Sequence, residues 1–217
     1  VTKITAAGAQ FIADMLVVNR ALTSVNLLKN DLGDGAAAVV AAAKQQGNIK
    51  TLCGIRPDQT EANFKRTRSS DTCTILKAAD ALLLNFDLQF NRALKALDLN
   101  SNNLGSEGAR VLCDALKHNS TLESLDVSNP NRSTSGESKA EGARYFADML
   151  LVNRALTSVN LLHNDLGDGA AAIVAAAKQN GNIKTLCGIA EGKTEVSFYD
   201  QSLKAPDAVL LSFDLEF

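Results

Sequence analysis

The residues of this chain that could carry catalytic or metal chemistry are few and scattered. Among its 217 residues are two histidines, His118 and His163, and four cysteines. They form no CxxC, HExxH or GxSxG pattern, and no glycine loop is followed by the Lys-Ser/Thr pair of a phosphate-binding motif. We therefore expect no catalytic residue, no metal site and no cofactor, and we expect the chain not to be an enzyme.

Charged residues offer binding chemistry instead. The segment 56–78 contains a basic run beside one aromatic ring, made of Phe64, Lys65, Arg66 and Arg68. An aromatic ring flanked by cations can anchor a protein partner, although a solvated polar loop has the same composition. A net charge of −2 and a pI of about 5.7 argue against a nucleic-acid partner, which needs more positive charge and more stacking rings.

The elements that position these residues follow from an internal duplication. Residues 8–55 recur at 142–189, with 41 of 48 positions identical at a constant offset of 134. Each copy contains a shorter period of 27–28 residues, which is the length of one strand plus one helix. Such a chain is an array, in which each unit buries its apolar faces only when neighbouring units stack on it.

The clearest unit spans residues 94–121. Leu97 and Leu99 alternate with small or polar residues, as in a strand with one buried face. Asn102 follows where the strand must turn, and its amide can bond backbone groups that have left the ladder. Apolar residues at helical spacing then occupy 109–116. This register predicts seven helices and six strands, and the strands begin at Leu22, Ile49, Leu94, Leu122, Leu156 and Ile183.

The recurring pattern LxxLxLxxNxLGxxGAxxLxxxLxxNxx resembles the leucine-rich repeat of the ribonuclease-inhibitor type. The resemblance implies an α/β fold: a right-handed solenoid, part of a horseshoe, with a parallel sheet on the concave face and helices on the convex face. Similar repeats occur in receptors of the nucleotide-binding, leucine-rich-repeat class and in the Ran GTPase-activating protein. Residues 1–217 would form one array of about seven repeats. Both end repeats are incomplete, so we expect a fragment of a longer chain.

Three insertions interrupt the repeat, near 56–78, 130–141 and 190–206. Each follows a strand, so we expect loops that project where strand passes to helix. In the second insertion, Pro130 stands where the turn asparagine should be, and the leucine that normally follows is missing.

The concave face can be described from the two outward positions of each strand. Asp98 and Asp126 occupy the same position in successive repeats, which places them on adjacent strands about 4.8 Å apart. They are either two solvated carboxylates relieved by Lys95, or an acidic spot for a lysine or arginine of a partner. The outward residues are all small, and none is aromatic or cationic: Ser24, Asn26, Thr51, Cys53, Ala96, Asp98, Ser124, Asp126, Ser158, Asn160, Thr185 and Cys187.

These features predict a scaffold for protein–protein interaction, with a protein partner of unknown identity. A GTPase-activating surface is one alternative, and it would need Asn129 or Arg132 to reach into a partner's active site. A structural spacer within a larger receptor or ciliary protein is another. Uncapped end repeats also predict self-association.

The compartment is predicted from the cysteines and from hydropathy. Cys53 and Cys187 are equivalent positions of the two copies, several repeats apart, so pairing between them is not expected. Free thiols indicate a reducing compartment, and we expect a cytoplasmic protein. No stretch approaches the roughly 18–20 apolar residues of a membrane span, so we expect no membrane partner.

Overall fold

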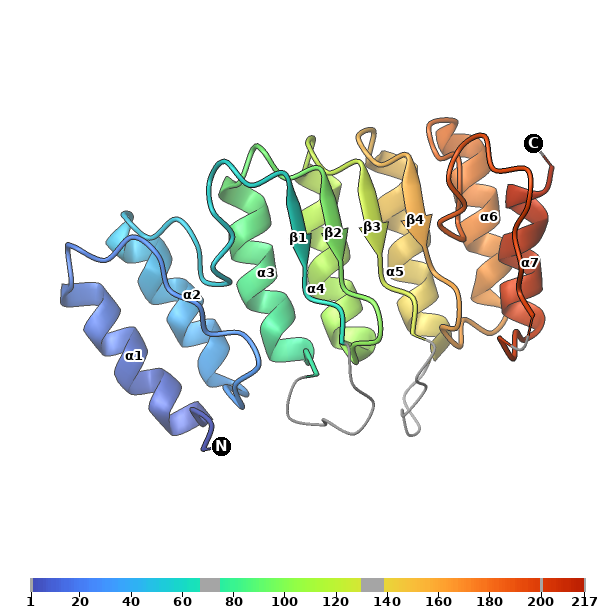
Figure 1. Ribbon diagram of the computed structural model, residues 1–217. Coiled ribbons are helices and arrows are strands. Elements are labelled where there is room, and N and C mark those ends of the chain that lie inside the picture. The colour runs from blue at the N-terminus through green and yellow to red at the C-terminus, as the bar shows by residue number, and fades with distance from the viewer. Residues whose placement is uncertain (1, 67–74, 130–138, 200, 217) are drawn as a thin grey trace.

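The computed structural model describes residues 2–66, 75–129, 139–199 and 201–216. They form one curved array in which a layer of helices packs against a layer of strands and extended segments (Figure 1). The described helices are α1 (Ala6–Val18), α2 (Gly35–Gln46), α3 (Ala78–Phe90), α4 (Gly105–His118), α5 (Lys139–Val152), α6 (Gly169–Asn180) and α7 (Ala205–Asp214). The described strands are β1 (Glu61–Asn63), β2 (Ala96–Asp98), β3 (Ser124–Asp126) and β4 (Ser158–Asn160). The α/β solenoid inferred from the repeat is confirmed.

The strands form a parallel sheet in the order β1-β2-β3-β4. The central residue of each strand faces the helices and is buried, which gives a continuous apolar row of Ala62, Leu97, Leu125 and Val159. A single bridge between Ser158 and Thr185 continues the pairing beyond β4, and another joins Ser24 to Thr51 in the N-terminal repeats, apart from this sheet. The alternation that predicted strands with one buried face is therefore the pattern that builds the core.

The helices pack by the apolar stripe expected from their spacing. In α4, Leu112, Cys113 and Leu116 are fully buried because α3 covers one side of the helix and α5 the other. Helix α2 is followed by a glycine at its C-terminal cap. Gly47 has a φ of 79°, which glycine adopts readily, and its N–H bonds the Ala43 carbonyl and closes the last turn.

The predicted turn asparagine is confirmed at Asn102. Its Nδ2 donates to the carbonyl oxygens of Leu99, at 2.9 Å, and Phe64, at 3.0 Å. Its Oδ1 accepts the N–H of Leu76 at 2.9 Å. One buried amide thus satisfies backbone groups from three segments that have left the ladder. Asn164 repeats the arrangement with Val127 and Leu161.

A second series of amides joins each repeat to the one before it. Asn119 accepts the N–H of Leu122 at 2.8 Å and donates to the carbonyl of Leu88 in the preceding helix, at 3.1 Å. Because the donor and acceptor bridge two repeats, each such residue fixes both the turn and the stacking. The residues at this position are Asn19, Gln46, Asn91, Asn119, Asn153 and Asn180.

Two buried aspartates of α3 interrupt the regular pairing of each strand with the next. Asp87 accepts the Thr51 hydroxyl at 2.5 Å and the Leu52 N–H at 2.6 Å. Asp80 accepts the N–H of Lys29 at 2.8 Å. The N–H groups of residues 52 and 53 therefore bond a side chain and not a further strand, and β1 pairs only with β2. We call this pair, Asp80 and Asp87, the aspartate joint.

The second copy has the same joint. Asp207 of α7 accepts the N–H of His163, and Asp214 accepts the N–H of Leu186 at 2.7 Å. The duplication therefore extends through α3 and α7, even though the segments that lead into these helices differ in length.

The expectation that 56–78 is a loop projecting from the solenoid is wrong for its middle part. Residues 61–63 form β1 and pair with β2 in register, Ala62 opposite Leu97. The reason lies in the joint: once 51–53 is held by Asp87, the edge of β2 is open, and the inserted segment supplies the missing strand. Residues 190–204 contain no described helix or strand, and 130–138 lie outside the described residues.

Candidate protein-binding surface

The concave face of the sheet has a shallow hollow of about 260 Å³ over β1, β2 and β3. Its floor is made by the small side chains Ala96 and Ser124. Three carboxylates line it, those of Glu61, Asp98 and Asp126. The sheet holds one on each strand, so the hollow is acidic. Asp98 and Asp126 lie directly opposite each other, whereas Glu61 lies opposite Ala96, two residues before Asp98 along the strand direction.

Asp98 and Asp126 lie side by side as expected, because they are register partners on β2 and β3. Each also stabilises its own strand end: Asp98 accepts the N–H of Asn100 at 2.9 Å, and Asp126 accepts that of Ser128 at 2.8 Å. Asn160 of β4 donates to the second oxygen of Asp126 at 3.0 Å. Part of the acceptor capacity of Asp126 is therefore used within the fold.

Lys95 does not relieve the two aspartates. Its Nζ pairs with Glu123 at 2.5 Å, and both side chains are about half exposed. Lys95 and Glu123 both come one residue before strands β2 and β3. Asp98 lies three residues after Lys95, and side chains alternate along a strand, so the two side chains are not directed to the same face. Lys95 pairs with Glu123, which holds the same place before β3.

Glu61 is a member of the acidic hollow that the sequence interpretation missed. It was assigned to a loop together with the rest of 56–78. The signal was present: Ala62 and Phe64 alternate with the polar residues Glu61, Asn63 and Lys65, a period of two residues. The run is short and sits inside an insertion, so the repeat register concealed it.

The predicted basic anchor is not one patch. Alternation along the chain separates its members: Phe64 is half-buried against the core, Lys65 is exposed, and Arg66 is buried with its N–H donated to Asn100. Arg68 lies outside the described residues. Phe64 thus packs against the core and holds β1 in place. Of the described cations in this basic run, Lys65 is the one exposed to solvent.

The outward positions of the strands near the joints are not on the concave surface. Thr51 and Cys53 are buried, as are Thr185 and Cys187. The Thr51 hydroxyl accepts the N–H groups of Cys53, at 3.1 Å, and Ile55, at 3.0 Å, so the chain curls here. Burial raises the pKa of the Cys53 thiol well above its usual range, which leaves it a poor nucleophile.

A larger hollow of about 690 Å³ lies where strands pass to helices, between the first turns of α4 and α5. Leu104 and Leu166, the turn leucines of the neighbouring repeats, line it together with Phe146. The β3 repeat has no such leucine after Pro130 in its sequence, and residues 130–138 lie outside the described residues. Asn129, one residue considered for a GTPase-activating surface, is half-buried here and donates its N–H to Leu162 at 3.2 Å. Arg132 lies outside the described residues.

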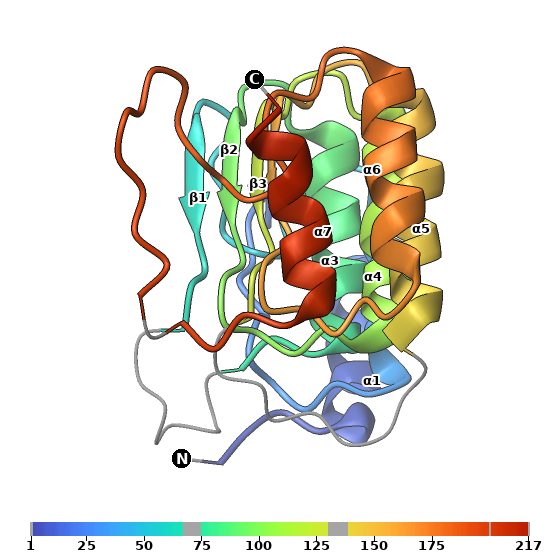
Figure 2. The same ribbon diagram turned by 90° about the vertical axis from the view of Figure 1, so that its right-hand side faces the viewer.

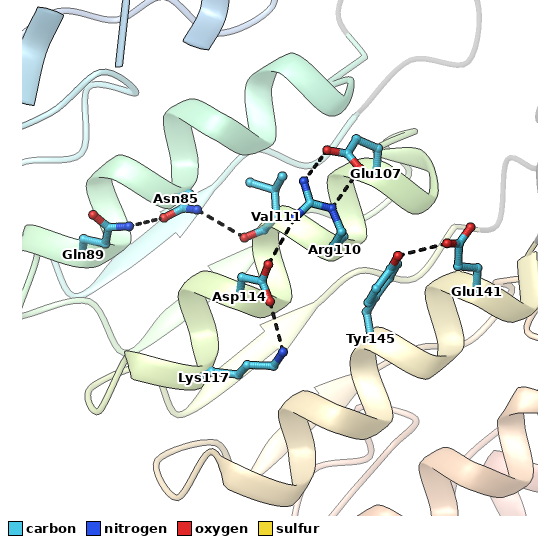
Figure 3. A network of polar contacts seen from close by, with 9 residues as sticks. All are labelled: Asn85, Gln89, Glu107, Arg110, Val111, Asp114, Lys117, Glu141 and Tyr145. Carbon is cyan, nitrogen blue, oxygen red and sulfur yellow. Dashed lines mark hydrogen bonds and ion pairs between the residues drawn. The ribbon is translucent and has the colours of Figure 1, made fainter. Parts of the chain in front are cut away.

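The convex face carries paired charges (Figure 3). On α4, Arg110 bridges Glu107 at 2.5 Å and Asp114 at 3.3 Å, and the hydrogen bond to Glu107 raises the pKa of its guanidinium. Tyr145 of α5 donates to Glu141 at 3.0 Å. Such exposed pairs each contribute little to stability. They neutralise one another, so this face lacks the one-sided charge of the concave hollow.

The histidines have structural positions. His163 corresponds to Lys29 of the first copy, a replacement that predicts a solvent-facing position, but the residue is buried in a turn with φ of 62° and donates its N–H to Asp207. His118 is exposed in the last turn of α4. Within the described residues, no three His, Cys, Asp or Glu side chains gather as a metal site would require.

Comparison with known proteins agrees with the repeat register. The family model described as "Leucine Rich repeat" matches residues 90–113. The human NACHT, LRR and PYD domains-containing protein 13 is 27% identical over 181 residues, which cover 82% of this chain and 15% of that protein. The ribonuclease inhibitor of Sus scrofa is 29% identical over 230 residues, which cover 85% of this chain and 49% of the relative. The chain thus spans less than half of either relative.

A solved structure of the leiomodin-1 actin-binding site 2 aligns with 79% of this chain and 88% of that one, at 18% identity and a TM-score of 0.42. No described helix is long and apolar enough to cross a membrane. The repeat register and the parallel sheet with its asparagine turns are those of a leucine-rich repeat, and the chain is similar to the leucine-rich-repeat proteins of the ribonuclease-inhibitor type.

Proposed function

We propose that this chain is a protein-interaction scaffold whose concave sheet binds a basic segment of a partner protein. The observation that supports this most directly is the acidic hollow, in which Glu61, Asp98 and Asp126 stand on three adjacent strands. Asp98 and Asp126 are register partners on strands about 4.8 Å apart, and Glu61 lies two residues before that row on β1, so a basic segment of a partner that crosses the strands could pair with these carboxylates.

The family supports a binding role without chemistry of its own. One relative is named ribonuclease inhibitor, which describes a protein whose target is another protein. A GTPase-activating surface has less support, because Asn129 is half-buried with its backbone bonded to the next repeat.

We also propose a cytoplasmic location. Cys53, Cys113 and Cys187 are free and buried, and burial is the main cause that raises the pKa of each thiol. Such cysteines are compatible with a reducing compartment, where they pack as small apolar side chains.

The test separates the two faces of the array. A partner captured on the wild-type chain is titrated against a concave variant, Glu61→Gln with Asp98→Asn and Asp126→Asn. The matched control is a convex variant, Glu107→Gln with Asp114→Asn. Exposed charge pairs contribute roughly 0.2–1 kcal/mol each, so the concave variant should bind about 3-fold to 100-fold more weakly and lose most of its salt dependence. Equal affinities for both variants would exclude the concave hollow.

A further inference from the structure

We propose that the C-terminal edge of the array, made of residues 194–198 and the outer flank of α7, is a docking surface for a leucine-rich repeat of the β2–α4 kind. The docked repeat would add a parallel strand to 194–198 and lay its helix on α7. This surface is separate from the concave hollow and does not depend on it.

Comparison of the two copies identifies residues 194–198 as the counterpart of the segment that contains β1. Thr60–Phe64, read TEANF, correspond at the constant offset of 134 to Thr194–Phe198, read TEVSF. The first segment contains β1, which pairs with β2. Phe64 and Phe198 are both half-buried and packed against the core, so the same aromatic residue fixes both segments. Figure 2 shows the orange-red segment extended at the end of the array nearest the viewer, on the sheet side of the helices.

The second segment lacks the strand that the first one has. In the first copy, Ala96 donates its N–H to Thr60 at 3.1 Å, and Phe64 donates to Asp98 at 2.8 Å. In the second copy, the N–H groups of Val196 and Phe198 donate to no group in the described part of the chain.

Side-chain burial points to the same missing neighbour. Ala62, the centre of β1, is 3% exposed, whereas its counterpart Val196 is 48% exposed. A strand edge that presents an apolar residue and open backbone groups is a template for pairing.

The helix behind the segment is also uncovered on its outer flank. The aspartate joint identifies α7 as the counterpart of α3, and it aligns Leu215 with Leu88. Leu88 is 1% exposed because α4 covers it, and its carbonyl accepts the Asn119 amide at 3.1 Å. Leu215 is 74% exposed. The second copy therefore presents both halves of a surface that β2 and α4 occupy in the first.

The chemistry of the docked repeat follows from β2 and α4, which cover the equivalent surface in the first copy. It needs a strand with inward leucines at the positions of Leu97 and Leu99, and small or acidic residues between them. It also needs an amphipathic helix that ends in an asparagine equivalent to Asn119, whose amide would reach the Leu215 carbonyl. Residues 91–119 of this chain have that pattern, so a repeat of this sequence is the occupant we assign.

The experiment uses a synthetic peptide with the sequence of residues 91–119, carrying Cys113→Ser, titrated against the full chain by fluorescence anisotropy. Saturable binding is expected. Val196→Pro should weaken it at least tenfold, because proline removes the N–H that faces the incoming strand. Ser197→Pro is the matched control: adjacent residues of a strand direct their N–H groups to opposite edges, so its binding should stay within about threefold.

A second readout covers the case in which the peptide does not fold on its own. The same 29-residue unit (numbers 91–119) joined after Phe217 should slow amide exchange at Val196 and Phe198 compared with the unextended chain, and Val196→Pro should abolish that protection. Unchanged exchange in the extended chain overturns the proposal. Equal losses for the two proline variants also overturn it, as does self-association through Val196, detected by sedimentation, that the peptide cannot compete away.

Discussion

Among single residues, the buried amides form hydrogen bonds that no apolar side chain could form, because each turn leaves backbone groups without a partner in the strand ladder. Asn102 serves three of them, from Leu76, Leu99 and Phe64. Asn102→Ala should lower the free energy of unfolding by about 1–3 kcal/mol, since those groups stay buried without a partner. Urea denaturation measures the loss, and Asn103→Ala at the exposed neighbour is the control. Identical midpoints for the two variants would contradict the assigned role.

Asp87 should give the stability of the chain an unusual pH dependence. Burial raises the pKa of its carboxyl to about 6, above the roughly 3.9 of an unfolded chain. The folded state therefore binds the proton more tightly, and the stabilisation that this proton provides is lost as pH rises from about 4 to about 6. Asn has no titrating carboxyl, so Asp87→Asn should lack this contribution to the pH dependence of stability.

Measured by urea denaturation at pH 4 and pH 7, the stability of wild type should fall relative to that of Asp87→Asn, by up to about 3 kcal/mol. Asp34→Asn is the control, because Asp34 is exposed and its side chain makes no cap hydrogen bond. A constant difference between Asp87→Asn and wild type across this range would show that Asp87 does not titrate there.

Among the secondary-structure elements, sequence periodicity predicted most of the repeat, because burial on one face leaves a pattern that recurs. The helices, the turn asparagine and the pairing of Asp98 with Asp126 all follow from it. It did not predict β1, because Glu61–Asn63 lies in an insertion and its place depends on Asp87, which is distant in sequence. Nor did it predict that Thr51 and Cys53 are buried, for the same reason.

A matched pair of substitutions tests the strand assignment. Ala62→Asp places a charge in the buried centre of β1, and we expect a loss of more than about 2 kcal/mol of stability or failure to fold. Val196→Asp, at the equivalent exposed position, should change stability by less than about 0.5 kcal/mol. Circular dichroism with thermal denaturation distinguishes them. Equal tolerance at both positions would mean that β1 contributes nothing to the sheet.

In the whole molecule, stability should decrease from the centre of the array toward its ends. Helix α4 is covered by α3 and α5, whereas α2 is the one described helix or strand that contacts α1, and α1 exposes Phe11 and Val18. Because repeats stabilise one another through their interfaces, amides of α1 and α7 should exchange faster than those of α4. Native-state hydrogen exchange tests this gradient. Uniform protection across the three helices would indicate a single cooperative unit in place of a nearest-neighbour array.

The near-identity of 8–55 and 142–189 has a consequence for how the chain reaches its fold. During folding, α1 and α2 carry almost the same contact surfaces as α5 and α6, so either pair can meet the partner meant for the other. Chains that choose wrongly form compact, mispaired species that must come apart before they proceed. The copies differ at seven positions, which include Tyr145 and Phe146 in the second copy. Within the two copies, these are the residues that can favour correct pairing of the helices over mispairing.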